Sequence, residues 1–350
     1  MTKFLVRRIL QAIPTLFGIS IISFLLMDQA PGDPVAAMTF GPDTRVEQVD
    51  DLMERYGLNE PVHMRYLRWL LGDKPIEILG VELWEGRRIE GRRDRVIVGD
   101  YAGAIRGDFG NSLFTRRPVD GMIAQRLTAT AELGVISLLV GFGLGIPLGI
   151  LAAVWQGSLF DNFTRIAAVF FSAVPNFWLG LILILIFGVQ LGILPMGNRC
   201  PLTIEGCENV TDRAQHLFLP VLVLSTGTLA VLSRYMRAAT LDVLNQDYIR
   251  TARAKGLKNG TVWFVHASRN ALVPVATIIG PAIPGILGGA LITETIFAWP
   301  GIGRLAYESV LRQDYPLVMA IVMFGSVLTV LGYLISDILY ALVDPRIRLS

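Results

Sequence analysis

Side chains able to do catalytic or metal chemistry are present, but the sequence keeps them apart. Long apolar runs separate the three histidines, His63, His216 and His266, and predict the first two on one membrane face and the third on the other. They therefore cannot share a metal ion. The sequence also lacks the GxxxxGK phosphate-binding loop with its following Ser or Thr, so we expect no ATP hydrolysis by this chain. We predict no catalytic residue, no metal and no cofactor bound by this chain.

The densest polar and basic stretch, residues 246–274, lies between two apolar runs that are each long enough to cross a bilayer. Small residues alternate with Arg and Lys over 248–255, and Gly256 then predicts a helix C-cap with Leu257 as its apolar contact. An Asn-Gly turn follows, and a second helix is predicted over 261–270. The alanines of the first helix permit close approach of another backbone, and its basic side chains can meet acidic groups.

The spacing of Ala252, Gly256 and the Leu-Val-Pro at 272–274 resembles the cytoplasmic "EAA" loop of ABC-importer permeases, with Arg250 where that pattern has Glu. With His266, the segment is similar to the B-type permease subunit of dipeptide and oligopeptide importers, in which this loop inserts into a groove on the ATPase subunit. The alternative is a solvated basic loop that only follows the positive-inside rule. The resemblance implies ATPase coupling by Tyr248, Arg250, Ala252, Arg253, Ala254, Gly256, Leu257 and His266.

Nearly the whole chain resembles the same family, except for one insertion at residues 72–105. The similar stretches are 4–34 with its Pro-Gly-Asp-Pro turn, 56–70, 107–119, 293–304 and 312–316. The resemblance implies an all-α polytopic fold of the type I ABC importer permease class. It also implies a paralogous permease subunit, two ATP-binding subunits that carry ATP and Mg, and an extracytoplasmic substrate-binding protein.

Composition independently indicates a protein of the lipid bilayer, because 53% of the residues are hydrophobic and 17% are charged. The net charge of +2, with no basic tail, gives no indication of a nucleic-acid partner. Apolar runs predict six membrane-spanning helices at 9–27, 131–154, 166–191, 217–232, 273–293 and 317–342.

The distribution of Lys and Arg orients these spans. The two short outer loops hold only Arg199, Arg213, Arg304 and Arg312, whereas the inner segments hold many more basic residues. Both termini are therefore predicted in the cytoplasm. The family resemblance implies that the spans lie in the inner membrane of a prokaryotic cell. We divide the chain into the N-terminus and first helix at 1–28, an extracytoplasmic domain at 29–130, and a five-helix permease core at 131–350.

Two of the spans carry residues that predict how they pack. Gly141, Gly145 and Gly149 form a stripe of four-residue spacing in the second span, which allows a neighbouring helix to come close. Pro175 lies inside the third span and predicts a kink there.

The fifth span and the loop at 294–316 are the predicted substrate pathway. Pro281 and Pro284 are expected to break the span, and broken backbone at membrane depth is tolerated only where protein or a water-filled cavity covers it. Glu294 and Arg304 place an acid and a base at the mouth of this predicted pathway, where they could gate the pathway or steer a zwitterionic peptide. Three large groups, Phe297, Trp299 and Tyr307, are available to a soluble partner, although Trp299 could be only a membrane-interface anchor. The candidate pathway residues are Pro281, Pro284, Gly285, Glu294, Trp299 and Arg304.

Residues 29–130 have a mixed composition typical of a soluble domain, and long loops translocate largely regardless of their charge. Helices are predicted over 47–56 and 62–71. Inside the insertion, 81–84 and 95–98 are predicted to pair as a β-hairpin. Its arginines either contact a binding protein or anionic lipid, or form a solvated tip; they are Arg87, Arg88, Arg92, Arg93 and Arg95.

The two cysteines, Cys200 and Cys207, fall in one short outer loop, where a disulfide is favoured over two free thiols in an oxidising compartment. Asp337 is the one acid well inside an apolar helix. A structural ion pair with Arg8, Arg234 or Arg237 is the expectation for it, although intramembrane acids are also functional candidates.

The family resemblance implies an ATP-driven importer for which this chain forms half of the pathway, with peptides as the substrate class. Nickel, glutathione and oligosaccharide importers use similar permeases and stay open as alternatives. An ion-coupled secondary transporter should show paired ionisable residues at mid-membrane, and Asp337 alone gives poor support for one. An intramembrane enzyme would need converging polar groups in the spans, which the sequence lacks.

Overall fold

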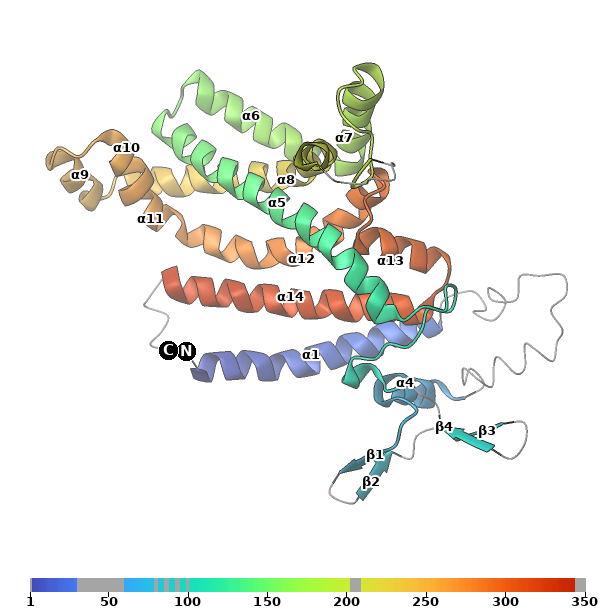
Figure 1. Cartoon of the computed structure of the whole chain (residues 1–350). Coiled ribbons are helices and arrows are strands. Elements are labelled where there is room, and N and C mark those ends of the chain that lie inside the picture. Colours follow the sequence, from blue (N-terminus) through green and yellow to red (C-terminus); the bar gives the residue numbers. More distant parts are fainter. Residues whose placement is uncertain are drawn as a thin grey trace. The chain divides into compact units, whose positions relative to one another are not determined.

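The structure is a computed structural model that describes residues 2–29, 60–78, 81–84, 88–91, 95–98, 101–201 and 209–343. Long helices dominate this part of the chain, together with two small β-hairpins (Figure 1). The chain divides into two compact units. One consists of Met1–Arg8, Leu127–Arg304 and Leu328–Ser350, and the other consists of Ile9–Arg126 and Leu305–Val327.

Four helices are long and apolar enough to cross a membrane, and a bent helix pair makes a fifth candidate span. The four are α1 (Thr2–Asp28), α5 (Val119–Val154), α8 (Val210–Leu244) and α14 (Tyr315–Val343). A further helix, α12 (Val273–Ile296), lies at the position predicted for the fifth span. The helical membrane fold is therefore confirmed, with a helix at each predicted position, while the count of six spans stays a prediction.

The third predicted span is two helices rather than one kinked helix. The α6 helix (Leu159–Ala173) is followed by α7 (Asn176–Leu183), which continues as the π-helical η2 (Ile184–Gln190), and the two parts meet at 102°. Val174 between them is extended, at φ −77° and ψ 124°. A residue before proline is pushed out of the α region, so Pro175 ends α6 instead of bending it.

The glycine stripe of α5 packs against α8, as its spacing predicts. A Cβ atom built on Gly141 or Gly145 would lie 3.0 Å from Thr228 or Leu232, and one on Gly149 would lie 2.5 Å from the Cβ of Met236. A larger residue at Gly149 would therefore force the two helices apart. Small residues allow this close approach in a membrane, where the hydrophobic effect does not drive helices together.

The predicted break in the fifth span is wrong, because α12 runs as one helix through Pro281 and Pro284. Proline is tolerated inside membrane helices where neighbouring groups satisfy the backbone it frees. Close packing accompanies the prolines here, since Gly280 lies against Ser336 and the carbonyl of Gly332 on α14.

The helix predicted over 62–71 is α4 (Val62–Leu71), and it packs against α1. The Tyr66 hydroxyl lies 2.8 Å from the hydroxyl of Ser20, and its ring meets Phe24 edge-on. An ion pair joins Arg65 to Asp28. Aromatic and polar contacts thus attach α4 to the end of α1.

The insertion forms two hairpins, so the predicted pairing of 81–84 with 95–98 is wrong. The β1 strand (Ile76–Ile78) pairs with β2 (Val81–Trp84), and β3 (Arg88–Gly91) pairs with β4 (Arg95–Val98), both antiparallel. Each strand pairs with its sequence neighbour through a short connection, which costs less loop entropy than the longer closure that we predicted. The helix predicted over 47–56 and the side chains of the arginine group lie outside the described residues.

Two stretches that resemble the peptide permeases, 107–119 and 312–316, contact each other. The α13 helix (Ile302–Leu311) is followed by Asp314, which is buried and accepts hydrogen bonds from the Ser112 hydroxyl and, at 3.0 Å, from Leu113 N. The Arg312 guanidinium lies 4.8 Å from the ring centre of Phe114. A short 3₁₀ turn, η1 (Ala104–Arg106), precedes this contact.

Candidate coupling and pathway sites

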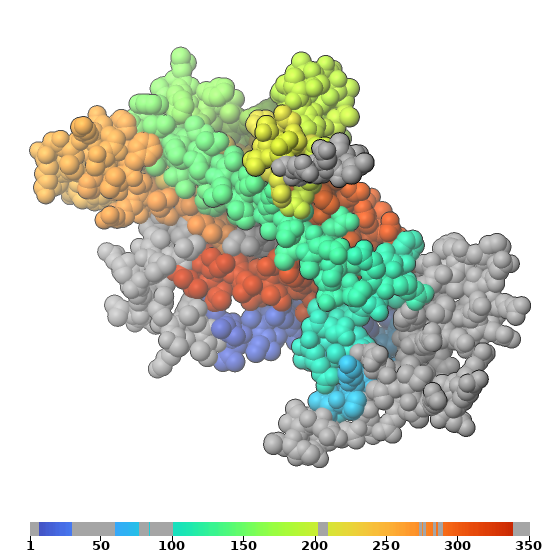
Figure 2. Space-filling view, viewed as in Figure 1, coloured from blue at the N-terminus to red at the C-terminus, as the bar shows by residue number. Residues whose placement is uncertain are grey.

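The basic segment forms the predicted helix, corner and second helix. The α9 helix (Asp247–Ala254) is followed by α10 (Asn259–Thr261), the π-helical η3 (Val262–Ala267) and α11 (Ser268–Ala271), which together make the second helix. In Figure 2 this segment projects as an orange lobe at the left, beside the green atoms of the same unit. Residues 247–271 thus form a discrete protrusion at one end of that unit.

A Schellman motif ends α9 and makes the corner. Gly256 has φ +75° and donates from N to the carbonyl of Arg253 at 2.9 Å, and Leu257 N donates to the carbonyl of Ala252 at 3.4 Å. Glycine adopts this left-handed conformation without the steric cost of a Cβ atom. The predicted glycine cap is confirmed.

An apolar cluster of Ile249, Ala252, Val262 and Ala267 joins the two helices of the segment. The last turns of α8 pack against it through Val243 and Leu244, and Trp263 completes the contact. Because this cluster is buried, the protrusion is attached to α8 by packing as well as by the chain.

The predicted coupling residues divide into an exposed surface and a buried position. Ala252 is 5% exposed and packs inside the segment, in the cluster with Ile249. His266 is half-buried, and Asn270 donates to the Tyr248 hydroxyl at 2.8 Å. The exposed candidates are Tyr248, Arg250, Arg253, Ala254, Gly256 and Leu257.

A buried ion pair lies close to the protrusion. Asp161 is 1% exposed and accepts two hydrogen bonds from Arg237 of α8, at 2.5 Å from Nε and 2.7 Å from the second guanidinium nitrogen. Asp161 also accepts from Gly157 N at 2.9 Å, and Ser158 caps α6 by accepting from Asp161 N. One carboxylate therefore joins the α5–α6 turn to α8. Sequence reasoning missed this pair, although it had singled out Arg237.

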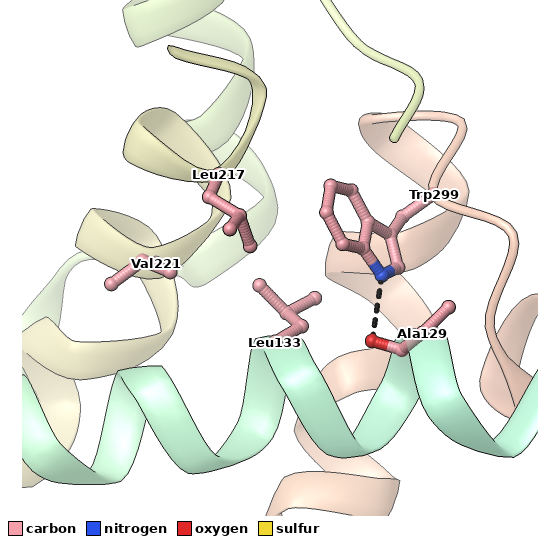
Figure 3. Close-up of a cluster of buried hydrophobic side chains, with 5 residues drawn as sticks. All are labelled: Ala129, Leu133, Leu217, Val221 and Trp299. Carbon is pink, nitrogen blue, oxygen red and sulfur yellow. Dashed lines mark hydrogen bonds between the residues drawn. The ribbon is translucent and has the colours of Figure 1, made fainter. Parts of the chain in front are cut away.

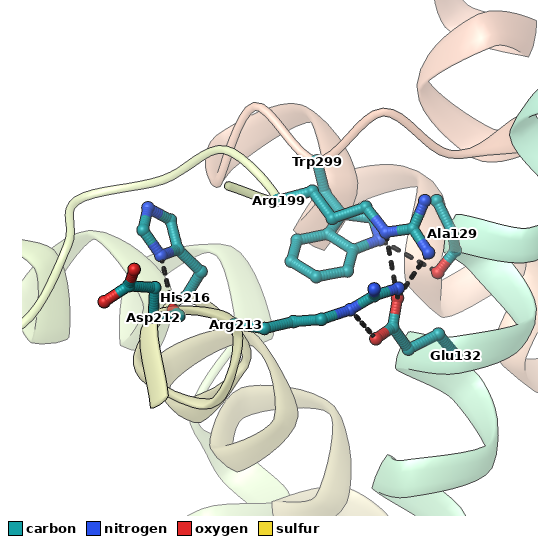
Figure 4. Close-up of polar contacts among 7 residues, drawn as sticks. All are labelled: Ala129, Glu132, Arg199, Asp212, Arg213, His216 and Trp299. Atoms are coloured by element: carbon teal, nitrogen blue, oxygen red, sulfur yellow. Dashed lines mark hydrogen bonds and ion pairs between the residues drawn. The ribbon is translucent and has the colours of Figure 1, made fainter. Parts of the chain in front are cut away.

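A second polar cluster lies at the other end of α8 (Figure 4). Glu132 of α5 accepts from Arg213 of α8 at 2.5 Å and 2.7 Å, and from Arg199 at 2.9 Å. Nearby, His216 is buried with its Nδ1 at 2.7 Å from the carbonyl of Asp212. The carboxylate thus holds the loop before α8 and the first turn of α8 to α5.

The loop after α12 is held against the same part of α5. Trp299 is fully buried between Leu133, Leu217 and Val221, and its indole nitrogen donates to the carbonyl of Ala129 at 2.9 Å (Figure 3). Phe297 is also buried, in a cluster with Leu179, Leu219 and Val223. The expectation that these two aromatic residues are available to a partner or at the membrane interface is therefore wrong, whereas Tyr307 is exposed.

Glu294 is fully buried and fixes the start of α13. It accepts from the Thr130 hydroxyl at 2.7 Å and from Arg304 N at 2.9 Å, while Thr130 accepts from Ile302 N at 2.7 Å. A carboxylate at a helix N-terminus is stabilised by the unpaired N–H groups there. Arg304 in turn donates to the carbonyl of Ala298 at 2.9 Å. The predicted acid and base are brought together, but as parts of a packed loop.

The remaining predicted residues are placed as follows. Pro281 and Gly285 are exposed on α12, and the side chain of Pro284 lies outside the described residues. Cys200 is disulfide-bonded. Cys207 is not among the described residues, so the pairing of Cys200 with Cys207 stays a prediction. Asp337 pairs with Arg8 at 3.0 Å, which is one of the three partners we predicted. Within the described ranges, no group of three or more His, Cys, Asp or Glu side chains could hold a metal ion.

Long apolar helices, with a basic helix–corner–helix protrusion packed onto one of them, are typical of an integral membrane protein. Two sequence models agree: "binding-protein-dependent transport system inner membrane component" matches residues 145–349, and the corresponding N-terminal model matches residues 1–75. The chain belongs to this family of ABC importer permeases, and it is therefore a multi-pass protein of the inner membrane.

Curated relatives match over the full length. The chain is 42% identical to the oligopeptide transport system permease protein AppB of Bacillus subtilis, over 99% of this chain and 100% of that protein. It is 36% identical to the dipeptide transport system permease protein DppB of Escherichia coli K12 and 34% identical to the glutathione transport system permease protein GsiC of the same strain, each over 99% of both chains. The MetNI methionine ABC transporter superposes with a TM-score of 0.49 and 16% identity, over 64% of this chain and 97% of that chain.

Proposed function

We propose that this chain is one of two permease subunits of an ATP-driven peptide importer and forms half of the translocation pathway. The observation that carries this proposal is the identity of 42% and 36%, over 99% of the chain, to permease proteins named for oligopeptide and dipeptide transport. Such an importer contains a paralogous permease subunit, two ATP-binding subunits and an extracytoplasmic binding protein. ATP and Mg would bind to the ATPase subunits, with no cofactor on this chain.

The protrusion at 247–271 is the proposed contact with one ATPase subunit. Its exposed surface is basic at Arg250 and Arg253, which suits an acidic groove, and Ala254 leaves room for close approach. Both termini and this protrusion would lie in the cytoplasm, in keeping with the excess of Lys and Arg on that side of the spans. The extracytoplasmic loops would receive substrate from the binding protein.

Coupling would proceed through contacts within one compact unit. ATP-driven closure of the ATPase subunits would displace the protrusion, and the buried cluster around Ile249 would move the end of α8 with it. The Asp161–Arg237 pair would pass this displacement to α6. The spans would then switch from an inward-open to an outward-open arrangement, and the binding protein would release peptide into the cavity.

Glutathione is a second candidate substrate, favoured by the 34% identity to GsiC. It differs from an ordinary tripeptide in its thiol and its γ-glutamyl linkage, so competition experiments can separate the two. Uptake of a labelled tripeptide should be inhibited by unlabelled tripeptides at concentrations where glutathione has no effect. Inhibition by glutathione alone would assign this importer to glutathione instead.

The experiment that tests the proposal compares cells with and without the gene for this chain. Deletion should abolish saturable uptake of labelled trialanine, and the parental sequence should restore it. Affinity purification of the restored protein should recover a second permease and two copies of an ATP-binding subunit. Unchanged trialanine uptake after deletion, in cells without another peptide importer, would refute the proposed function.

A further inference from the structure

Arg234 is a charged residue inside a membrane-crossing helix, and no carboxylate among the described residues pairs with it. Its Nε donates to the carbonyl of Ala230 at 3.2 Å, and its terminal nitrogen donates to the Ser172 hydroxyl at 3.3 Å. The side chain is exposed on α8. By contrast, Arg213 and Arg237 on the same helix each form a short ion pair with a carboxylate.

The guanidinium of Arg234 points into the span rather than toward its nearer end. It bonds the carbonyl four residues earlier, so the side chain runs back along α8, away from the protrusion. A snorkelling arginine would extend the other way, toward the end of the helix. The residue it reaches on α6, Ser172, lies about 16 Å along that helix from Asp161 at the α5–α6 turn, at 1.5 Å per residue.

This depth makes contact with lipid unfavourable. The fourth predicted span ends at residue 232, and the Arg234 guanidinium bonds the carbonyl of Ala230, so the charged group lies inside the last turn of that span. Charged groups at such depth face a water-filled cavity or the interior of a bundle, where they contact another polar group. The Ser172 hydroxyl and one carbonyl supply acceptors for only part of the five N–H donors of an arginine.

We propose that Arg234 lines the translocation pathway and binds the terminal carboxylate of the peptide that passes through it. This inference rests on the proposed function, because it takes peptides as the transported substrate. A guanidinium matches a carboxylate with two parallel hydrogen bonds, which a neutral amide cannot replace. Peptides of any sequence carry one such carboxylate, so a single arginine serves a pathway that does not select side chains. Because the Arg234 side chain is exposed, water can compete for the bound carboxylate, and the peptide can be released.

The test compares two probes that differ only at the carboxylate, trialanine and trialanine amide, in cells that contain the assembled importer. Arg234→Gln should lower the initial rate of trialanine uptake about tenfold, which is the change expected from the loss of one charge-assisted hydrogen bond. The same variant should change the rate of uptake of the amide less than twofold. Arg234→Lys should retain most of the trialanine uptake, because it keeps the charge. Arg165→Gln is the matched control, since it removes an exposed arginine from α6 near the α5–α6 turn and should leave both rates unchanged.

A second measurement tests water access without relying on transport. In purified importer, a cysteine at Arg234 should react with a small charged methanethiosulfonate at least about ten times faster than a cysteine at Phe170, an exposed apolar position on α6 that faces lipid if Arg234 faces water. Equal reaction rates at the two positions would overturn the proposal.

The outcomes separate this inference from the proposed function. If the parental importer takes up trialanine and Arg234→Gln lowers trialanine and its amide equally, Arg234 does not bind the carboxylate. A fall in the amount of assembled importer with that equal loss would assign Arg234 to a contact with the second permease, which also overturns the proposal. Failure of the parental importer to transport any tripeptide would overturn the proposed function as well, while fast labelling at Arg234 would still assign it to a pathway for another anion.

Discussion

The Asp161→Asn substitution tests whether the ion pair between the α5–α6 turn and α8 holds this end of the unit together. Asparagine has nearly the size of aspartate and can still accept the hydrogen bond from Gly157 N, but it removes the charge opposite Arg237. Loss of one partner from a buried pair costs about 3 to 5 kcal/mol, because the other charge is left uncompensated. We expect the lower end of that range, since Arg237 is 20% exposed and reaches some solvent.

Thermal unfolding of the purified importer in detergent measures this effect. At about 2.1 cal/mol/K per residue, a loss of about 3 kcal/mol corresponds to a decrease in Tm of about 4 °C for a chain of 350 residues. The Asp161→Asn/Arg237→Gln double variant carries no unpaired charge and should recover most of the loss. Asp247→Asn is the control, because the Asp247–Arg250 pair is exposed and its removal should cost less than about 1 kcal/mol.

The same variants test transmission from the protrusion. If the pair passes motion to α6, the stable double variant should still import fewer peptides per ATP hydrolysed than the parental importer. A single variant that unfolds at the parental temperature, or a double variant that is less stable than the single one, would refute the energetic reasoning. A double variant with parental coupling would leave the pair a purely structural contact.

Three further predictions concern packing, the outer loop and topology. Gly149→Ala should destabilise the protein by about 1 to 3 kcal/mol, because its Cβ would lie 2.5 Å from Met236, while Gly143→Ala on the same helix meets nothing within 4 Å and should be neutral in Tm. Glu294→Ala should lower the yield of folded importer rather than only slow uptake, since it removes the buried acceptor of the Thr130 hydroxyl and of Arg304 N, at about 1 to 3 kcal/mol for each lost contact; parental yield with slow uptake would instead favour a gate. A cysteine at Asn259 should resist an impermeant thiol reagent in intact cells lacking Cys200 and Cys207, while one at Gly91 should react, and equal labelling would overturn the predicted orientation.

Local signals in the sequence predicted the protrusion well. Gly256 at the end of a short helix is sufficient to predict a left-handed cap, and the structure has it at φ +75°. The glycine stripe of α5 likewise predicts close packing on its own, because only small residues let two backbones approach. The stripe does not reveal its partner, and the structure identifies α8.

Long-range polar pairs could not be predicted, because the sequence does not say which spans are neighbours. Glu132 meets Arg199 and Arg213, and Asp161 meets Arg237, only after α5, α6 and α8 pack together. Each basic residue alone was accounted for by the positive-inside rule or by a loop position. The Asp337–Arg8 pair was anticipated because an acid inside an apolar helix needs a partner.

The errors about Trp299 and Pro281 have one physical origin. Aromatic and turn residues after a span suggest an exposed loop, and proline suggests a break, when each is considered without its surroundings. Burial of the Trp299 indole against α5 and packing of α12 on α14 override both local preferences.

The most direct test of the account is import measured together with ATP hydrolysis in proteoliposomes that hold the assembled importer and its loaded binding protein. We predict that labelled trialanine crosses the membrane only when ATP is present on the side of the protrusion. Ala254→Glu, which adds an acid to the exposed basic surface, should reduce both import and stimulated hydrolysis at least about tenfold without changing basal hydrolysis. Import driven by an ion gradient without ATP, and unaffected by Ala254→Glu, would contradict the account.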